Sequence, residues 1–337
     1  MAWFECTTGA SSGNGVALIV TTDASFAGSN ITASNGEDTF TQQCPSSAPY
    51  VVTFENIPTG TYTISGVTGG QTVSKTFVVS DYNFEFHDIP TGSTATPVNV
   101  IQTWLHCANI WNKTYTTINQ VLADTSTLLA LISSNNAADY MARSTNWASS
   151  VCANQTAMGY IGNNNYCANK LLANSTWLNA ICNSTYFESV LNVKVPTMTS
   201  NTTPSGNVIA DYAQSGYDAY HAFDGNDNTF WNTYGSANPA AGHWIGYSFT
   251  RAVCVRMVTI LGRYNEPYNS IKDYKIQGSN DGFANDIHTL ATGQCAQNQG
   301  TTKVIFANNT NYKNMRVYAD NAWSGYIGAS TIQFYGR

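Results

Sequence analysis

The spacing of hydrophobic residues changes along this 337-residue chain, and this change constrains the fold more than any other feature. Residues 16–93 alternate between apolar and polar side chains, residues 97–133 follow a seven-residue period, and residues 134–195 repeat in short units. After a linker at 196–206, residues 207–337 alternate again. Alternation predicts strands and a period near 3.5 predicts helix. We therefore predict a multidomain, mainly β protein with a helical middle.

Short alternating segments broken by turn residues predict a small antiparallel β-sandwich over residues 16–93. Residues 1–15 end in a Gly- and Ser-rich run and are expected to form a flexible N-terminal attachment segment. The stretch from Phe54 to Tyr62 resembles the turn of prealbumin-like and carboxypeptidase-regulatory-like domains. That resemblance implies an Ig- or prealbumin-like sandwich. In this turn Gly60 is expected to have a positive φ, and the side chain of Tyr62 is expected to lie in the core. The expected strands are Val16–Thr22, Asn30–Ala33, Tyr50–Phe54, Thr61–Ser65, Lys75–Val79 and Phe84–His87.

A heptad pattern over residues 97–133 predicts one long helix. Nine of its ten a and d positions are apolar or aromatic, and only Thr125 departs. Such a seam favours a homo-oligomeric coiled coil, with a trimer preferred because bulky aromatics occupy the seam. The alternative is an amphipathic helix that packs within one chain. The residues expected to mediate oligomerisation are Ile101, Trp104, Ala108, Trp111, Tyr115, Ile118, Leu122, Leu129 and Ile132.

Residues 134–195 repeat with a step of nine to eleven that is doubled once. Each unit has Asn, Ser or Thr at a capping position, followed by apolar residues about one helical turn apart. This pattern predicts a stalk of short helices that persist only when stacked on neighbours. The repeat resembles the Asn- and Ser-capped spacers of bacteriophage tail-fibre and other appendage proteins. Cys152, Cys167 and Cys182 recur at a step of fifteen, which also indicates repeat geometry.

The composition excludes several classes of partner. Charged residues make up 10% of the chain. Its 14 Lys and Arg are outnumbered by 20 Asp and Glu, which gives a net charge of −6, so no basic stripe is available for nucleic acid. No apolar run is long enough for a membrane span, and the first residues show no secretory signal. Without that signal, reduced and buried thiols are favoured over four disulfides for the eight cysteines.

Four ordered motifs mark residues 207–337. They begin at Tyr217, His243, Tyr274 and Ile332, and read YDAYHAFDGNDNTFW, HWIGYSF, YKIQGSNDG and IQFYG. Together they resemble the discoidin, or coagulation factor type C (F5/8 type C), family, whose fold is a β-sandwich jelly roll. The apolar residues of these short segments are expected to fill the space between two sheets. They are Phe223, Trp231, Trp244, Ile245, Val258, Ile260, Ile276 and Phe334.

The resemblance implies a carbohydrate-binding domain that holds its ligand on loops at one end of the sandwich. In sugar-binding relatives an aromatic ring stacks on the sugar and polar side chains bind its hydroxyls. Arg263 would supply a charged donor fork and Trp323 a loop aromatic. The carbohydrate-binding candidates in the matching loops are Tyr234, Arg263, Tyr264, Asn265, Trp323 and Tyr326.

The loop at residues 224–229 suggests a metal. Relatives in the carbohydrate-binding branch hold a structural calcium ion there, together with a late glutamate. Thr331 stands at the late position, so Ca2+ and a network of Asx turns are both open. The candidate metal ligands are Asp224, Asn226, Asp227 and Thr229.

No catalytic motif was found, which predicts a binding protein and not an enzyme. The parts together suggest a bacteriophage virion fibre, assembled in the bacterial host cytoplasm. Its partners would be cell-surface or environmental glycans, further copies of itself, and other virion proteins that meet the N-terminal segment. The alternatives are a purely structural capsid decoration or head fibre, and a bacterial adhesin or accessory carbohydrate-binding protein.

Overall fold

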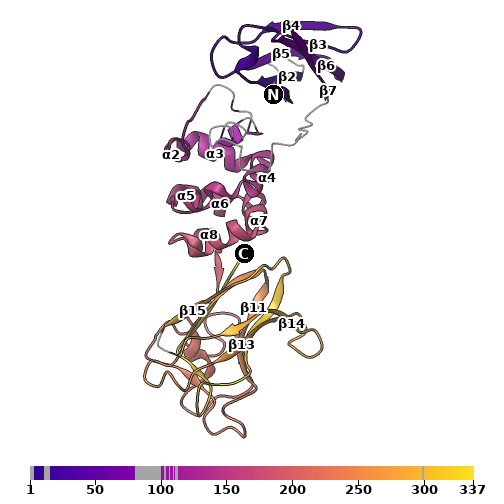
Figure 1. Cartoon of the computed structure of the whole chain (residues 1–337). Helices are drawn as coiled ribbons and strands as arrows, with labels where there is room; N and C mark the ends of the chain where they lie inside the picture. The colour runs from indigo at the N-terminus through magenta and orange to yellow at the C-terminus, as the bar shows by residue number, and fades with distance from the viewer. Residues whose placement is uncertain are drawn as a thin grey trace. The chain divides into compact units, whose positions relative to one another are not determined.

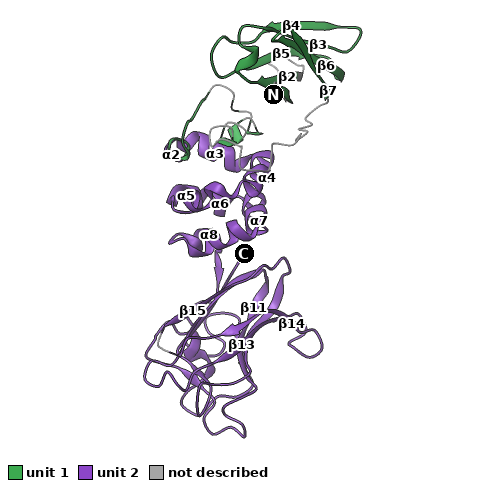
Figure 2. Ribbon diagram, viewed as in Figure 1, with its two compact units in different colours: residues 1–121 green, residues 122–337 purple. Residues whose placement is uncertain are grey.

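The computed structural model describes residues 4–10, 16–79, 113–297 and 300–337, together with positions 100, 101, 104, 105, 107, 108 and 110. The chain forms two compact units, residues 1–121 and residues 122–337 (Figure 2). Among the described helices, none has the length and apolar character needed to cross a membrane.

The first unit contains a β-sandwich of two antiparallel sheets. Leu18, Phe54 and Ile64 are among the side chains that fill the space between them, because alternate residues of each strand point inward. One sheet has the order β1-β2-β5 and the other the order β4-β3-β6-β7. The strands are β1 (Phe4–Ala10), β2 (Val16–Thr22), β3 (Asn30–Ser34), β4 (Thr39–Gln43), β5 (Val51–Ile57), β6 (Gly60–Thr68) and β7 (Gln71–Val79), with a short 3-10 helix, η1 (Ala24–Phe26).

The alternation predicted this sandwich, but not all of its strands. Residues 4–10 form β1 along β2, so this part of the expected flexible segment is ordered. In the turn before β6, Tyr62 is fully buried as predicted and its hydroxyl donates to Pro58 O at 3.0 Å. The positive φ, +58°, occurs at Asn56 and not at Gly60. The strand expected at Phe84–His87 lies outside the described residues.

The long coiled-coil helix predicted over residues 97–133 is wrong for the described part of this range. Residues 113–117 are not helical, α2 spans Ile118–Ala123, and Asp124 then caps a separate helix, α3 (Thr125–Ser133). Most seam residues are covered by their own chain, which corresponds to the intrachain alternative. Ile101, Trp104, Ile118, Leu122 and Ile132 are buried, Ala108 and Tyr115 are half-buried, Leu129 is exposed, and Trp111 lies outside the described residues.

The second unit begins with a ladder of short helices that repeats every ten residues, which confirms the short helices predicted over residues 134–195. Its N-cap positions are Asp124, Ser134, Ser144, Asn154, Asn164 and Asn174. Ser184, the C-cap of α8, continues the ten-residue step and accepts a hydrogen bond from Tyr186 N. After α3 the helices are α4 (Asn135–Arg143), η2 (Thr145–Trp147), α5 (Ala148–Cys152), α6 (Gln155–Asn163), α7 (Asn165–Leu172), α8 (Ser175–Asn183) and η3 (Phe187–Ser189). The unit that begins at Asn154 accounts for the doubled step in the sequence.

Three helices make one turn of this ladder, so each helix stacks on the one thirty residues later. Helix α3 contacts α6, α4 contacts α7, and α5 contacts α8 (Figure 1). Hydrogen bonds join the turns: Asn164 Nδ2 donates to Ile132 O at 3.0 Å, and Trp177 Nε1 donates to Met141 O at 2.8 Å. Helices of five to nine residues are unstable alone, and this stacking buries their apolar faces.

A second sandwich completes this unit. A five-stranded sheet with the order β14-β13-β16-β11-β9 faces a four-stranded sheet with the order β15-β12-β18-β8, and β10 pairs with β17. Phe223, Trp231 and Phe334 lie in its core as predicted, with Ile245, Val258, Ile260 and Ile276. The strands are β8 (Val193–Lys194), β9 (Asn207–Ala210), β10 (Trp231–Asn232), β11 (His243–Val253), β12 (Val255–Leu261), β13 (Asp273–Ser279), β14 (His288–Gln294), β15 (Thr301–Ile305), β16 (Tyr312–Ala319), β17 (Gly328–Ala329) and β18 (Thr331–Gly336), with η4 (Ala219–Phe223).

Trp244 is the exception among the predicted core residues. Its neighbours Ile245 and Tyr247 point inward and are buried. Because side chains alternate along a strand, Trp244 lies on the outer face of the five-stranded sheet, where it is half-buried.

The linker predicted at residues 196–206 is built into the sandwich. Within it, Met198 is buried, and its backbone N–H donates to Phe223 O. Strand β8, just before it, pairs with β18. The helical ladder also contacts this sandwich directly. Lys303 Nζ donates to Cys182 O at 3.2 Å, and the Arg337 guanidinium donates to Gly162 O at 2.8 Å. These bonds satisfy carbonyls near helix ends that the helices leave unpaired.

Candidate carbohydrate-binding site

Loops from three places meet at one end of the second sandwich. The loop after β12 carries Arg263, Tyr264 and Asn265, the loop after β10 carries Tyr234, and the loop before β17 carries Tyr326. Strands β10 and β17 are paired, so the last two loops leave the sandwich side by side. Five of the six predicted carbohydrate-binding residues meet here in one group, the Arg263 cluster: Tyr234, Arg263, Tyr264, Asn265 and Tyr326.

Arg263 is the centre of this cluster. Its side chain is 3% exposed, and its guanidinium donates to Glu266 Oε2 at 2.9 Å, to Tyr326 Oη at 2.5 Å and to Asn265 Oδ1 at 3.1 Å. Its Cζ lies 3.9 Å from the centre of the Phe230 ring. With so many of its donors engaged, Arg263 orients its neighbours more than it offers a free fork to a ligand.

Glu266 balances the charge of Arg263. Its Oε2 accepts hydrogen bonds from Arg263, from the Tyr326 hydroxyl and from Asn269 Nδ2. Hydrogen bonds from Tyr326 and Asn269, with the nearby Arg263 cation, hold the pKa of Glu266 below its usual 4.5. The centre is therefore an ion pair without net charge at neutral pH.

Aromatic rings surround this polar centre. Tyr217 stacks on Phe230 with ring centres 4.7 Å apart, and Tyr264 lies at 6.3 Å on another side of Phe230. Tyr234 meets Tyr326 edge to face at 5.3 Å. Tyr234 is 58% exposed and Tyr264 is 38% exposed. Solvent-facing rings beside hydrogen-bonding groups suit a ligand that has both C–H faces and hydroxyls.

Trp323 lies apart from these rings. It is half-buried, its backbone N–H donates to Ser270 O, and Lys272 Nζ lies 5.1 Å from its ring centre. It adjoins the Arg263 cluster through Ser270, whose hydroxyl accepts from Arg263 N at 2.8 Å. Its predicted contact with a sugar stays a prediction.

Sequence reasoning missed four members of the cluster: Tyr217, Phe230, Glu266 and Asn269. Glu266 follows Arg263 by three residues, which reads as an ordinary surface ion pair. Tyr217 and Phe230 belong to the family motif, but the sequence predicted no role for either side chain. Their side chains reach the site because Arg263 stacks on Phe230, which no local pattern reveals.

The loop proposed for calcium is closed by its own hydrogen bonds. Asp224 accepts from Asn226 N at 2.8 Å and from Thr229 Oγ1 at 2.7 Å, and Asp227 Oδ1 accepts from Thr331 Oγ1 at 2.7 Å. Among the described residues, no group of three or more His, Cys, Asp or Glu side chains could hold a metal. These oxygens fit Ca2+ poorly, because they already accept hydrogen bonds within the domain. In addition, Thr331 provides a hydroxyl where the late glutamate of calcium-binding relatives would provide a carboxylate.

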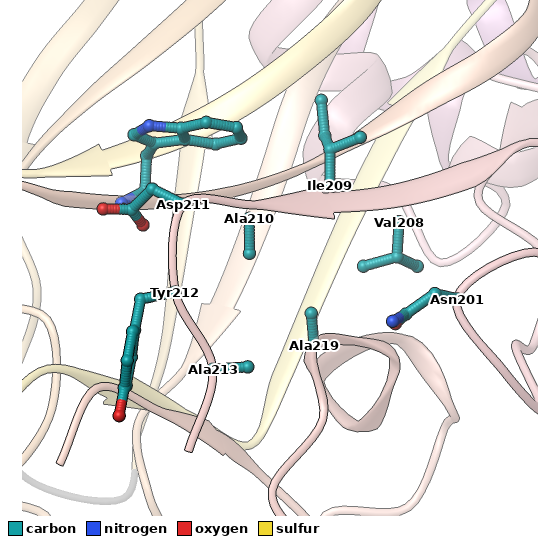
Figure 3. Close-up of a pocket in the computed structure, with 9 residues that line it drawn as sticks. Asn201, Val208, Ile209, Ala210, Asp211, Tyr212, Ala213 and Ala219 are labelled. Carbon is teal, nitrogen blue, oxygen red and sulfur yellow. The ribbon is translucent and has the colours of Figure 1, made fainter. Parts of the chain in front are cut away.

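A hollow of about 440 Å³ lies beside strand β9 (Figure 3). Ala210, Ala213 and Ala219 point into the same space, with Tyr212 on one side and Asn201 on the other. The lining residues are Asn201, Val208, Ile209, Ala210, Asp211, Tyr212, Ala213, Ala219 and Trp244. The sequence predicted no ligand site among these residues.

Comparison with known proteins identifies the domain that carries these features. Residues 198–332 match the F5/8 type C domain model. No curated protein matches the chain. Among solved structures, the chain is similar to a family 32 carbohydrate-binding module from C. perfringens NanJ in complex with galactose. The identity is 20%, the match covers 42% of this chain and 99% of that chain, and the TM-score is 0.36.

The chain is also similar to two further solved structures. One is the CpGH89CBM32-5 module of Clostridium perfringens in complex with GalNAc-β-1,3-galactose, at 17% identity, covering 41% of this chain and 100% of that chain, with a TM-score of 0.36. The other is chitosan-binding module 1 from a chitosanase/glucanase of Paenibacillus sp. IK-5, at 23% identity, covering 41% and 96%, with a TM-score of 0.33. At these identities the likeness concerns the fold.

Proposed function

We propose that the F5/8 type C domain at residues 198–332 binds a neutral glycan at the Arg263 cluster. The observation that carries this proposal is the pairing of two solvent-facing rings, Tyr234 and Tyr264, with a polar centre of no net charge. A sugar ring can stack on either tyrosine while its hydroxyls meet Asn265 and the Tyr326 hydroxyl. An acidic sugar would find the Arg263 charge already matched by Glu266.

The proposed role of the whole chain is that of a non-enzymatic virion appendage of a bacteriophage. The modular order supports it: a β-sandwich, a ladder of ten-residue helical repeats, and a terminal recognition domain. The ladder bonds directly to that domain through Lys303 and Arg337, so the sugar site is carried at a defined position on it. Several copies on one particle would multiply weak sugar contacts.

A glycan array probed with the full chain tests the sugar proposal. Wild-type protein and Tyr166→Ala, which removes an exposed tyrosine from helix α7, should bind the same neutral glycans. Tyr264→Ala and Tyr234→Ala should lose most of this signal, because ring stacking provides much of the binding energy of such sites. Silence of the wild-type protein on bacterial surface glycans would favour a purely structural role instead.

Mass spectrometry of purified phage particles tests the appendage role. The chain should copurify with capsid and tail proteins in constant proportion. Its presence only in the host-cell or culture fraction would favour a bacterial adhesin or an accessory carbohydrate-binding protein.

A further inference from the structure

His243 is a buried histidine whose two ring nitrogens both meet oxygen atoms. It is the first residue of strand β11 and is 9% exposed. Its Nδ1 lies 2.6 Å from Oδ2 of Asp211, the residue that follows strand β9. Its Nε2 lies 3.0 Å from Asn238 O and 2.9 Å from Ser236 Oγ, both in the loop between β10 and β11. The ring therefore joins that loop to the chain leaving the edge strand of the five-stranded sheet.

These partners assign a proton to each ring nitrogen of His243. A carbonyl oxygen only accepts hydrogen bonds, so Nε2 donates to Asn238 O. An ionised carboxylate also only accepts, so Nδ1 donates to Asp211. The ring is then an imidazolium beside a carboxylate, and charge-assisted hydrogen bonds hold it in place. Asp211 is fixed in turn, because its Oδ1 accepts from Trp244 N at 2.9 Å.

Ser236, His243 and Asp211 have the order of a catalytic triad, but their hydrogen bonds differ from those of a triad. A triad histidine takes the serine proton at Nε2, so this nitrogen must be unprotonated before the reaction. Here the carbonyl of Asn238 keeps a proton on Nε2, and the Ser236 hydroxyl has no base. The three residues hold the loop in place and do not activate Ser236.

The same loop carries Tyr234 of the Arg263 cluster. Ser236 N donates to Thr233 O at 3.1 Å, which closes a turn around Tyr234. On the other side of this loop, Ile327 N donates to Pro239 O at 2.9 Å, just before strand β17. The loop is thus held by the histidine on one side and by the segment before β17 on the other. These contacts determine where the exposed tyrosine ring lies.

We propose that His243 is a positioning residue for the glycan site, because it fixes the loop that presents the Tyr234 ring. It acts through this loop and does not contact the ligand. A ring that is already in place stacks on a sugar without the entropy cost of ordering the loop on binding. Affinity should therefore depend on a side chain outside the Arg263 cluster. This inference rests on the proposed function, since Tyr234 matters only if the cluster binds glycan.

Two substitutions separate the two contacts of the ring. The amide nitrogen of Gln lies near the place of the histidine Nε2, so His243→Gln keeps a donor for Asn238 O. The amide nitrogen of Asn lies near the place of Nδ1, so His243→Asn keeps the contact with Asp211 and loses the contact with the loop. His288→Asn is the matched control, because His288 is an exposed histidine paired with Asp286 at the opposite edge of the sheet.

Two measurements on the full chain test the arrangement without a ligand. Ring 15N chemical shifts at pH 7, assigned by comparison with His243→Gln, should show both nitrogens of His243 protonated. Amide hydrogen exchange over residues 233–242 should be about 5- to 10-fold faster in His243→Asn than in the wild-type protein, the value of one hydrogen bond. His243→Gln and His288→Asn should both exchange within about twofold of the wild-type rate.

Calorimetry with galactose and N-acetylglucosamine tests the role in binding. His243→Asn should bind the sugar that the wild-type protein binds about 5- to 10-fold more weakly, while His243→Gln and His288→Asn should stay within about twofold. Equal affinity of the Asn and Gln variants at position 243, or an unprotonated Nε2, would overturn the positioning role while glycan binding stands. Binding of neither sugar by the wild-type protein would overturn the positioning role together with the neutral-glycan proposal.

Discussion

The guanidinium carbon of Arg263 lies 3.9 Å from the centre of the Phe230 ring, although 33 residues separate them in the chain. This stacking covers one face of the guanidinium. Its two terminal nitrogens donate to Glu266, Tyr326 and Asn265. The arrangement makes Arg263 a link between Phe230 of the family motif and the loops that carry Asn265 and Tyr326. Substitutions there should affect folding and binding together.

Replacing Arg263 should destabilise the domain. In Arg263→Met the aliphatic stem remains, but Glu266 and Asn265 lose their donor, so the free energy of unfolding should fall by roughly 1–3 kcal/mol. Chemical denaturation measures this change. Arg251→Met, at an exposed position on β11, should change it by less than about 0.5 kcal/mol. Equal stability of the two variants would show that the hydrogen bonds of Arg263 contribute nothing.

Glycan binding should resist mild acid because of Glu266. The pKa of this carboxyl is held below its usual 4.5 by Tyr326, Asn269 and Arg263. A carboxyl with a lowered pKa stabilises the folded site at pH values above 4.5, and this contribution is lost as pH falls through the lowered value. Binding should therefore hold from pH 7 to pH 4.5 and decline below it.

Titration of binding against pH checks this expectation, with Glu266→Gln as the comparison. The variant keeps an acceptor at this position but has no carboxyl to protonate, so its weaker binding should not show the same decline. A wild-type curve that falls well above pH 4.5 would assign the transition to another group.

Much of the fold could be predicted from the sequence because local patterns determine it. The repeated Asn and Ser caps predict short helices, since a capping side chain acts within three residues. The unit that begins at Asn154 was missed because it has no aromatic residue where its neighbours have Trp147 or Trp177. Its cap and its buried residues follow the same ten-residue pattern.

The coiled-coil prediction was wrong for a different reason. A heptad pattern shows that a helix face must be covered, but not whether another chain or the same chain covers it. Here Asp124 accepts a hydrogen bond from Thr127 N and starts a new helix, which breaks the seam. Most of the described seam residues are then buried within their own chain, although Leu129 is exposed.

The candidate site was predictable only in part. Loop aromatics and Arg263 follow from the family motifs, but Glu266 and the hollow depend on loops that meet only in the folded domain. Trp244 was assigned to the core because an apolar residue in a strand reads the same on either face. Because Ile245 and Tyr247 point inward, the alternation along β11 places the Trp244 side chain on the outer face.

The repeat caps should contribute measurably to stability. Asn164→Ala removes the bond from Cys167 N and the bond to Ile132 O, which joins two turns of the ladder. The free energy of unfolding should fall by about 1–2 kcal/mol. Asn169→Ala, at an exposed position inside α7, should have no effect or a slightly stabilising one, because alanine favours helix. Similar losses from both would contradict the capping role.

The thiols of the ladder should not react while the protein is folded. Burial raises the pKa of Cys152, Cys167 and Cys182 to about 12, so almost no thiolate forms at pH 8. Mass spectrometry after iodoacetamide treatment at pH 8 should find these three unmodified in native protein and modified in denaturant. Rapid modification of native protein would show that the ladder opens in solution.

The loop at residues 224–229 should respond to calcium only after a carboxylate is added. In the wild-type chain the Thr331 hydroxyl donates to Asp227, so the late ligand of calcium-binding relatives is a hydroxyl that completes the loop. Thermal unfolding of the wild-type protein should be nearly the same in millimolar Ca2+ and in EDTA.

Thr331→Glu places a carboxylate beside Asp227 and Asp224, so this variant should be less stable than the wild-type protein in EDTA. It should regain stability with Ca2+ but not with Mg2+, which demands a tighter octahedral site. Thr331→Gln separates size from charge and should show no calcium response. Strong stabilisation of the wild-type protein by Ca2+ would instead mean that the hydrogen-bonded loop rearranges to take the ion without the missing glutamate.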